Sequence, residues 1–256
     1  MKNLWNDDEA AACGDDPLAL RVHSSRLIGR ASDLVLHGGG NTSVKAEFTD
    51  IFGVSHDVLY VKGSGWDLAT IEAAGFAPVA LDALLQLSRF DVLSDADMVR
   101  AQRAAMLDPG APNPSVEAIL HALIPFRFVD HTHADAVVTI TNLADGEARC
   151  RDVFGDRVLI VPYVMPGFGL SKKINEVYTK NPNINCLILL NHGIFTFANH
   201  AKKSYDLMIK YVSDAEKAIK KLKSKKIKQI KNYKTKFSAY EIAPILRGLL
   251  SENKDQ

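Results

Sequence analysis

Three histidines are the residues whose spacing points most directly to chemistry. His131 and His133 stand two apart in the stretch 128–141, which is rich in Val, Ile and Thr and predicts one or two strands. Residues two apart on a strand face the same side, so both imidazoles can bind one zinc or similar divalent ion. His192 lies where the apolar run 186–190 meets a glycine, at a predicted strand end. Each feature alone also fits an ordinary strand-edge or loop histidine, but the three together predict a metal site.

A carboxylate suited to acid–base chemistry is Glu117, in the sequence Pro-Ser-Val-Glu at 114–117. Near a metal held by histidines, a carboxylate can be a fourth ligand or a general base, because the ion sets its pKa. The other interpretation is a glutamate at a helix N-terminus that offsets the helix dipole. His121 follows one helical turn later on the apolar side, which favours a core or supporting role over metal ligation.

Two glycine-rich turns follow predicted strands. One reads Gly-Gly-Gly-Asn-Thr-Ser at 38–43, and the other reads Lys-Gly-Ser-Gly at 62–65. Exposed backbone N–H groups in such turns, with hydroxyls and a lysine nearby, can bind an oxyanion such as phosphate. Neither turn has the spacing of a P-loop or of the dinucleotide-binding fingerprint, so nucleotide binding is not predicted. A plain hairpin turn is the alternative for each.

The motifs occur in an order that resembles the class II aldolase/adducin family. That order is Gly-Gly-Asn-Thr-Ser, Lys-Gly-Ser-Gly, Pro-Ser-x-Glu, His-x-His and, at 191–193, Asn-His-Gly. The resemblance extends over about residues 18–250 and is greatest to the aldolase half of bifunctional rhamnulose-1-phosphate aldolase/alcohol dehydrogenase proteins. Ordered motifs make this resemblance more specific than any one of them.

The resemblance implies a role for each motif. His131, His133 and His192 match the ligands of the family's catalytic zinc, and another divalent cation such as cobalt or manganese would suit the same ligands. Glu117 matches the catalytic glutamate, which binds the metal at rest and moves a proton during the reaction. No Schiff-base lysine is implied, and Lys62 is expected to contact phosphate. The segments that bind the substrate phosphate supply Asn41, Thr42, Ser43, Ser64, Gly65 and Ser115.

The reaction that the resemblance implies is the reversible cleavage of a ketose 1-phosphate, with L-rhamnulose 1-phosphate as the expected substrate. The products would be dihydroxyacetone phosphate and L-lactaldehyde. A divalent ion would act as a Lewis acid, and Glu117 would return a proton in cleavage and remove one in condensation. A sugar-phosphate 4-epimerase or dehydratase on the same fold is the alternative enzyme. A non-catalytic interaction module, as in the adducin branch, is a further alternative, and the retained histidines argue against it.

Alternating helices and strands must position these residues. A helix is predicted at 16–31, from an Asp-Pro start, and another at 115–124 with Ser115 as its N-cap. Further helices are predicted at 78–90, 96–106 and 201 to about 231. Further strands are predicted at 57–61, 158–164 and 185–190. This spacing is not the regular one of a doubly wound dinucleotide fold.

The resemblance makes the expected fold specific. It implies an α/β fold in which a single domain, residues 1–240, has a central, mainly antiparallel sheet flanked by helices. Residues 241–256 resemble the connector to the dehydrogenase domain of the bifunctional relatives. Because these 256 residues contain no such domain, we expect no oxidoreductase activity. The resemblance also implies a homotetramer with active sites at subunit interfaces, where a neighbouring chain can supply the second acid/base.

Composition excludes several classes of protein. Apolar residues make up 47% of the chain and charged residues 24%, which is ordinary for a globular protein. No apolar run approaches the ~18 residues of a membrane span, and the acidic N-terminus has no apolar signal segment. We therefore expect a cytoplasmic protein without a membrane partner. The three cysteines share no Cys-x-x-Cys spacing, which argues against a disulfide framework and a thiolate zinc site.

Charge is distributed unevenly along the chain. Residues 1–171 contain 13 Lys and Arg against 23 Asp and Glu, whereas residues 172–256 contain 18 against 7. This break indicates either a domain boundary or a gene assembled from two sources of different base composition. We favour the second because the motifs draw on both parts. The lysine cluster 217–236 has no interleaved aromatics beyond Tyr233 and the adjoining Phe237, so it predicts a solvated helix face and no nucleic-acid partner.

Overall fold

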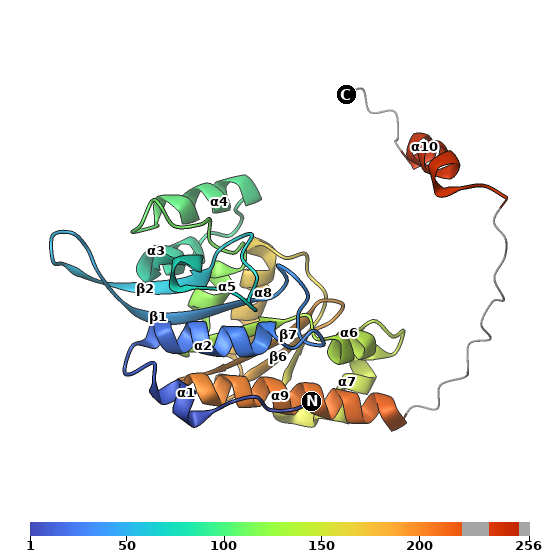
Figure 1. Cartoon of the computed structure of the whole chain (residues 1–256), viewed down its shortest axis with the longest axis horizontal. Helices are drawn as coiled ribbons and strands as arrows, with labels where there is room; N and C mark the ends of the chain where they lie inside the picture. The colour runs from blue at the N-terminus through green and yellow to red at the C-terminus, as the bar shows by residue number, and fades with distance from the viewer. Residues whose placement is uncertain (222–235, 251–256) are drawn as a thin grey trace. The chain divides into compact units, whose positions relative to one another are not determined.

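The computed structural model describes residues 1–221 and 236–250. Contacts divide the chain into two units, Met1–Lys221 and Leu222–Gln256. The first unit is built on one seven-stranded sheet with the strand order β3-β2-β1-β4-β7-β6-β5 (Figure 1). All neighbouring strands are antiparallel except β5 and β6, which confirms the expected α/β fold with a mainly antiparallel sheet. The strands are Asn41–Thr49 (β1), Ser55–Lys62 (β2), Phe76–Ala80 (β3), Phe128–Thr132 (β4), Leu159–Val161 (β5), Cys186–Leu189 (β6) and Gly193–Ala198 (β7).

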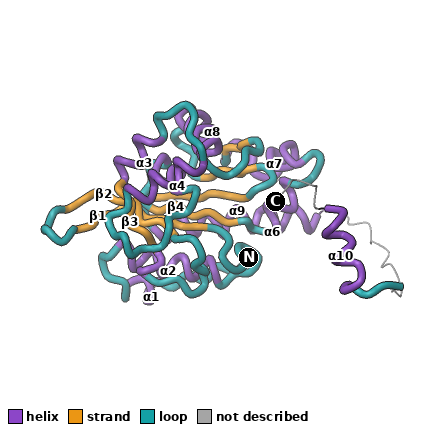
Figure 2. The backbone as a smooth tube through the Cα atoms, turned by 90° about the horizontal axis from the view of Figure 1, so that it is seen from above, coloured by secondary structure: helices purple, strands orange, loops and turns teal. Residues whose placement is uncertain are grey.

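Helices cover both faces of this sheet, as the view from above shows (Figure 2). One face is covered by Pro17–Gly29 (α2), Asp135–Thr141 (α6), Gly146–Phe154 (α7) and Ala201–Lys221 (α9). The other face is covered by Leu81–Leu87 (α3), Asp95–Ala104 (α4), Ala118–Leu123 (α5) and Phe168–Thr179 (α8). The remaining helical segments are Asp7–Ala11 (α1), the short 3₁₀ turns Ala73–Gly75 and Gly155–Arg157, and, in the second unit, Ala239–Leu250 (α10).

The apolar runs of the sequence become strands that are buried on both faces. In β6, Cys186 and Ile188 pack on the side of α9, whereas Leu187 and Leu189 pack on the side of α8. Successive side chains of a strand point to opposite faces, so a strand between two helix layers needs an unbroken apolar run. This arrangement places the ends of β4 and β6 in the buried interior beside the predicted site.

Two helix predictions agree closely with the structure at their starts. The side chain of Asp16 accepts a hydrogen bond from the backbone of Leu18 and caps α2, with Pro17 as the first helical residue. Helix α9 begins at Ala201 and runs beside α2 along the sheet (Figure 1). Its predicted end near residue 231 lies outside the described residues.

Two other element predictions are wrong. Only residues 128–132 of the predicted strand 128–141 form a strand, and residues 135–141 form α6. The β-branched residues there adopt a helix because Val137 and Ile140, three positions apart, both bury against α9. Residues 78–80 of the predicted helix 78–90 likewise form the end of strand β3 instead. This is an edge strand of the sheet, where Pro78 and its missing N–H group are tolerated.

The charge break at residue 171 is not a domain boundary. It falls inside α8, whose residues Phe168 and Leu170 before the break and Ile174 after it are all buried in the first unit. The predicted domain boundary at 240 stays a prediction: the first unit ends at Lys221, and α10, which begins at Ala239, spans part of the predicted connector. Among the described helices, none is long and apolar enough to cross a membrane.

Candidate active site and metal centre

The sheet brings the three predicted histidines together from two distant segments. His131 is on β4, His133 follows the end of that strand, and His192 is in the turn between β6 and β7. Strand β7 pairs with β4 in antiparallel register, which carries the turn across to the end of β4. The ring centroid of His131 lies 4.8 Å from that of His133 and 4.9 Å from that of His192, and the last two lie 5.1 Å apart. One nitrogen from each ring lies within 4.8 Å of the others.

The turn that carries His192 depends on its two neighbours. Asn191 has a φ of 58°, a left-handed conformation that asparagine tolerates better than most residues, and its side chain donates to Asn142 Oδ1 at 2.7 Å. A Cβ on Gly193 would lie 2.4 Å from the carbonyl oxygen of Thr132 and 3.2 Å from the nearest ring atoms of His131 and His133. Any side chain at residue 193 would therefore push this turn away from β4.

The buried ring of His131 is held in one orientation. It stacks on Phe195 with a centroid separation of 4.0 Å, and its Nδ1 lies 3.0 Å from the carbonyl oxygen of Ile194. Because that carbonyl can only accept, Nδ1 carries the proton and Nε2 presents its lone pair toward Nε2 of His133, 3.0 Å away. Burial lowers the pKa of all three histidines below the ordinary value, that of His192 to about 4. Three neutral imidazoles that meet in this way form a donor set that fits a divalent cation.

Glu117 lies beside this donor set. Its Oε2 lies 3.5 Å from Nε2 of His131, and its Oε1 lies 3.7 Å from Nε2 of His192. Burial raises the pKa of Glu117 to about 7, and the hydrogen bond from the side chain of Asn41 at 2.6 Å acts in the opposite direction. The described residues offer no hydrogen-bond partner to Oε1, although buried carboxylate oxygens are ordinarily paired. A cation among the histidines would supply that partner.

The helix prediction around Glu117 needs a correction. Helix α5 begins at Ala118, so the position before its first residue is Glu117, and the predicted N-cap Ser115 lies outside the helix. The Ser115 hydroxyl instead accepts from the backbone N–H of Glu117 at 3.3 Å and from Asn41 at 3.1 Å. The Glu117 side chain makes no capping bond, which leaves both carboxylate oxygens directed away from the helix.

A cavity of about 310 Å³ opens beside the histidines and Glu117. Its walls come from both glycine-rich turns and from the segment before α5. Of the predicted phosphate-binding residues, it is lined by Asn41, Ser64, Gly65 and Ser115. Lys62 also lines it and is almost completely buried, with Nζ donating to the carbonyl oxygen of Gly38 at 3.1 Å. The cavity therefore combines one lysine, two hydroxyls and glycine-rich backbone, a combination suited to an anion.

Thr42 and Ser43 do not reach this cavity. The glycine-rich turn ends at Gly40 and β1 begins one residue later, so these two residues belong to a central strand of the sheet. Both side chains are fully buried, and they point to opposite faces. The hydroxyl of Thr42 lies 2.8 Å from that of Ser25, and the hydroxyl of Ser43 lies 2.8 Å from Nδ1 of His121. Their predicted contact with phosphate is therefore corrected: both hydroxyls are used inside the fold.

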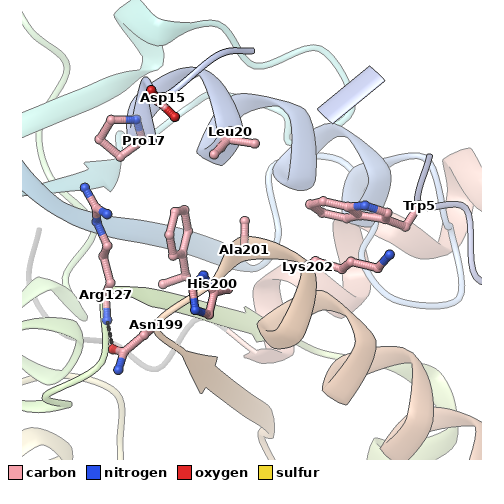
Figure 3. A pocket seen from close by; sticks show the side chains of 10 residues that line it. Trp5, Asp15, Pro17, Leu20, Arg127, Asn199, His200, Ala201 and Lys202 are labelled. Carbon is pink, nitrogen blue, oxygen red and sulfur yellow. Dashed lines mark hydrogen bonds between the residues drawn. The ribbon is translucent and has the colours of Figure 1, made fainter. Parts of the chain in front are cut away.

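A second concavity lies between the start of α9 and α2 (Figure 3). It measures about 210 Å³ and is lined by Trp5, Leu20 and Phe128, together with several polar residues. The backbone N–H of Arg127 donates to Asn199, and Lys202 is paired with Asp7 at 2.7 Å. None of the predicted site residues lines it, so the cavity beside the histidines is the candidate active site.

Comparison with known proteins shows the family of the chain. Residues 21–219 match the family model described as Class II Aldolase and Adducin N-terminal domain. A protein from Bacillus subtilis (strain 168) named uncharacterized oxidoreductase YuxG is 35% identical over 261 residues, which cover 99% of this chain and 38% of that protein. The chain therefore spans less than two-fifths of the length of that relative.

Solved structures with the same fold include two informative cases. The N-terminal class II aldolase domain of a conserved protein from Thermoplasma acidophilum is 39% identical, with a TM-score of 0.79 over 86% of this chain and 99% of that one. An L-fuculose-1-phosphate aldolase from Thermus thermophilus has a TM-score of 0.52 over 79% of this chain and 95% of that one. At 15% identity, the second likeness concerns the fold alone.

Proposed function

The chain belongs to the class II aldolase and adducin family, and on that basis we propose that it is a divalent-metal-dependent aldehyde-lyase. The proposed reaction is the reversible cleavage of a ketose 1-phosphate, with L-rhamnulose 1-phosphate as substrate and dihydroxyacetone phosphate and L-lactaldehyde as products. The observation that carries the proposal is that three imidazoles and one buried carboxylate meet beside a cavity suited to an anion.

The residues proposed to hold the metal are His131, His133 and His192, with Glu117 as a fourth ligand before substrate binds. When bound, zinc or a similar ion supplies Lewis-acid stabilisation of the negative charge that develops on the ketone oxygens. Burial lowers the pKa of the three imidazoles, so they are unprotonated at pH 7 and can bind a cation, and as neutral ligands they leave its positive charge undiminished. This favours the accumulation of negative charge on the substrate.

Glu117 is proposed to move the proton. A general base works best when its pKa lies near the operating pH, and burial raises the pKa of Glu117 to about 7. The carboxylate would remove a proton from the ketone in condensation and return it in cleavage. Its 2.6 Å hydrogen bond from Asn41 restrains the direction from which it acts.

The phosphate group is proposed to bind at the glycine-rich end of the cavity. Ser64, Gly65, Ser115 and Asn41 line that cavity, and Lys62 adds a buried positive charge that an anion would pair with. Binding energy gained at the phosphate would hold the reacting carbon atoms in register with Glu117. The family resemblance further supports a homotetramer in the cytoplasm, with a second acid/base from a neighbouring chain.

A zinc-dependent cleavage assay tests this proposal. The chelator-treated chain is repleted with zinc and offered a panel of ketose 1-phosphates, and the products are separated and identified. We expect two three-carbon fragments from L-rhamnulose 1-phosphate, and almost none without metal. Glu117→Gln, which keeps the shape of the side chain, should lower kcat by about 10²- to 10⁴-fold.

The same assay separates the alternatives. A six-carbon product with inverted configuration at C4 would identify a 4-epimerase. A product formed by loss of one water molecule from the substrate would identify a dehydratase. A fully active Glu117→Gln variant would remove Glu117 as the base. A chain that binds no zinc and converts none of the sugars would favour the interaction module.

A further inference from the structure

A buried row of hydrogen bonds runs from the interior of the sheet to Glu117. The Ser43 hydroxyl lies 2.8 Å from Nδ1 of His121, and Nε2 of His121 lies 2.5 Å from Oδ1 of Asn41. Nδ2 of Asn41 then donates to Oε2 of Glu117 at 2.6 Å and to the Ser115 hydroxyl at 3.1 Å. Asn41 is the one side-chain donor that the described residues offer to this carboxylate.

Two regular elements align this row. Asn41 and Ser43 are two apart on β1 and so face the same side of the sheet, where Asn41 is paired in register with His131 on β4. Glu117 and His121 are one helical turn apart, just before and within α5, so both reach toward β1. The row is therefore a ladder between one strand and one helix.

With Glu117 ionised, the chemistry of the groups fixes the direction of every bond. An ionised carboxylate only accepts, so the NH₂ group of Asn41 must face Glu117 and its carbonyl oxygen must face His121. That oxygen only accepts, so Nε2 of His121 must carry a proton. Nδ1 is then a bare lone pair, and it accepts the hydroxyl proton of Ser43. One tautomer of His121 satisfies the whole row.

The surroundings keep His121 neutral and immobile. Its ring is fully buried and packs edge-on against Phe195 with centroids 5.4 Å apart. Burial, together with the nearby cations Lys45 and Arg21, lowers the pKa of His121 well below its ordinary value. The ammonium group of Lys45 donates to the carbonyl oxygens of residues 121, 124 and 126 at 2.6 to 2.9 Å, which fixes the end of α5.

We propose that His121 is a positioning residue that holds the Asn41 amide with its NH₂ group toward Glu117 and so fixes the catalytic carboxylate. An asparagine amide can turn over and exchange its oxygen and nitrogen. In the reversed orientation, its oxygen would lie against a carboxylate oxygen and the two acceptors would repel each other. The Nε2–H group of His121 stabilises only the productive orientation. The catalytic consequence rests on the proposed function, whereas the tautomer of His121 does not.

The tautomer can be measured directly by ¹⁵N NMR of histidine side chains in the chelator-treated and zinc-loaded protein. The His121 signals are assigned by their loss in His121→Gln. We expect a proton on Nε2 that exchanges slowly with water, and no proton on Nδ1, in both samples. A proton on Nδ1, or rapid interchange of the two tautomers, would overturn the proposal.

Matched substitutions test the consequence for Glu117. His121→Gln keeps an N–H donor within reach of Asn41, whereas His121→Phe keeps an aromatic ring but has no donor. We expect kcat to fall by about 10- to 100-fold in His121→Phe and by less than about fivefold in His121→Gln. KM should stay within about twofold and zinc content should be unchanged in both, because His121 is not among the metal ligands.

The alternative is that His121 only fills space. Losses of kcat that follow the melting temperature of each variant, without rescue by glutamine, would show this and contradict the proposal. Should His121→Phe fail to fold, the NMR measurement and the kcat of His121→Gln still decide. A wild-type chain that cleaves no ketose phosphate would contradict the proposed function while leaving the tautomer measurement valid.

Discussion

Strand β4 separates two buried polar clusters of opposite character. On one face Asp130 pairs with Arg21 at 2.6 Å and accepts from Ser204 at 2.5 Å, while the guanidinium also bonds to the hydroxyls of Ser24 and Ser25. On the other face, His131 and the two other histidines direct ring nitrogens at one another. The first cluster satisfies its own charges and needs nothing further. The second is satisfied only by something that binds.

This difference gives a physical criterion for separating support from function. Both clusters consist of buried polar residues, so burial alone does not distinguish them. Buried charges persist in a fold when they are paired and hydrogen-bonded, as Arg21 and Asp130 are. Oδ1 of Asp130 and Oε1 of Glu117 both lack a hydrogen bond among the described residues, but only Oδ1 of Asp130 lies against a guanidinium, that of Arg21 at 2.6 Å. A buried carboxylate without a counter-charge, rather than burial alone, marks the candidate active site.

The largest expected effect comes from breaking the cluster of Arg21 and Asp130, in which the charges are paired with each other. Arg21→Leu leaves the carboxylate of Asp130 buried without its counter-charge and should lower the free energy of unfolding by about 3–5 kcal/mol. Urea denaturation of the metal-free protein measures this. The control is Arg149→Leu, which removes an exposed pair with Asp145 and should leave stability nearly unchanged. A loss below about 1 kcal/mol in Arg21→Leu would contradict the account of this cluster.

The next effect concerns the geometry of the open cluster, that is, the three histidines His131, His133 and His192. Gly193→Ala places a methyl group where Thr132 O would lie only 2.4 Å away, so the turn must move and carry His192 off the other histidines. We expect a destabilisation of about 1–3 kcal/mol and a loss of most zinc binding. Gly169→Ala is the matched control, because its Cβ would lie 3.7 Å from the nearest atom, inside helix α8. Normal zinc content in Gly193→Ala would show that the close approach is unnecessary.

Acid should affect the open cluster. Burial lowers the pKa of His121, His131, His133 and His192 in the folded chain, that of His192 to about 4. The unfolded chain, with ordinary histidine pKa values near 6.5, therefore binds more protons below that pH, and metal-free stability should fall as pH drops from about 6.5 to about 4.

Glu117 partly offsets this acid effect. Its pKa is raised to about 7 by burial, so its own contribution runs the other way, with stability lost as pH rises from about 4.5 to about 7. His192→Leu should reduce the loss of metal-free stability at acid pH, because it removes one histidine and leaves Glu117 in place. Melting temperatures of the metal-free wild type and variant across this range provide the measurement. Identical pH profiles for the two proteins would contradict the assignment.

The smallest effect distinguishes a hydroxyl inside the fold from a hydroxyl on the cavity wall. Thr42→Val removes a hydroxyl that bonds Ser25 on the side of Arg21, and it should cost about 1 kcal/mol of stability with kcat and KM within about twofold of wild type. Ser64→Ala removes a hydroxyl from the wall of the cavity and should raise KM without such a loss of stability. Steady-state kinetics of the two variants test this, and a raised KM in Thr42→Val would restore its predicted contact with phosphate.

The sequence predicted the fold class and the grouping of motifs better than the individual contacts. Ordered motifs from residue 38 to residue 193 indicated the fold and the meeting of His192 with His131, although no local pattern shows that β7 pairs with β4. Strand periodicity placed His131 and His133 on one side because that rule depends only on the backbone. The mainly antiparallel sheet followed from the resemblance, since antiparallel pairing has no local signature in short, doubly buried strands.

Other features depended on packing that a single sequence does not display. Residues 135–141 read as a strand because Val, Ile and Thr favour strands, yet their burial against α9 made them a helix. Thr42 and Ser43 were assigned to an exposed turn because the point where β1 begins is set by its partner strands. The roles of Gly193 and Arg21 come from close approach and long-range pairing. Of these features, only the close approach at residue 193 had a sign in the sequence, which is the glycine directly after His192.

The proposed reaction requires His131, His133 and His192, with Glu117, to hold one divalent cation. The most direct measurement is zinc content together with zinc X-ray absorption of the chelator-stripped, zinc-repleted chain, beside His192→Leu. We expect about one zinc per chain with nitrogen ligands at about 2.0–2.1 Å in the wild type, and loss of most of it in the variant. Less than about a tenth of an equivalent in the wild type, or undiminished zinc in His192→Leu, would contradict the claim.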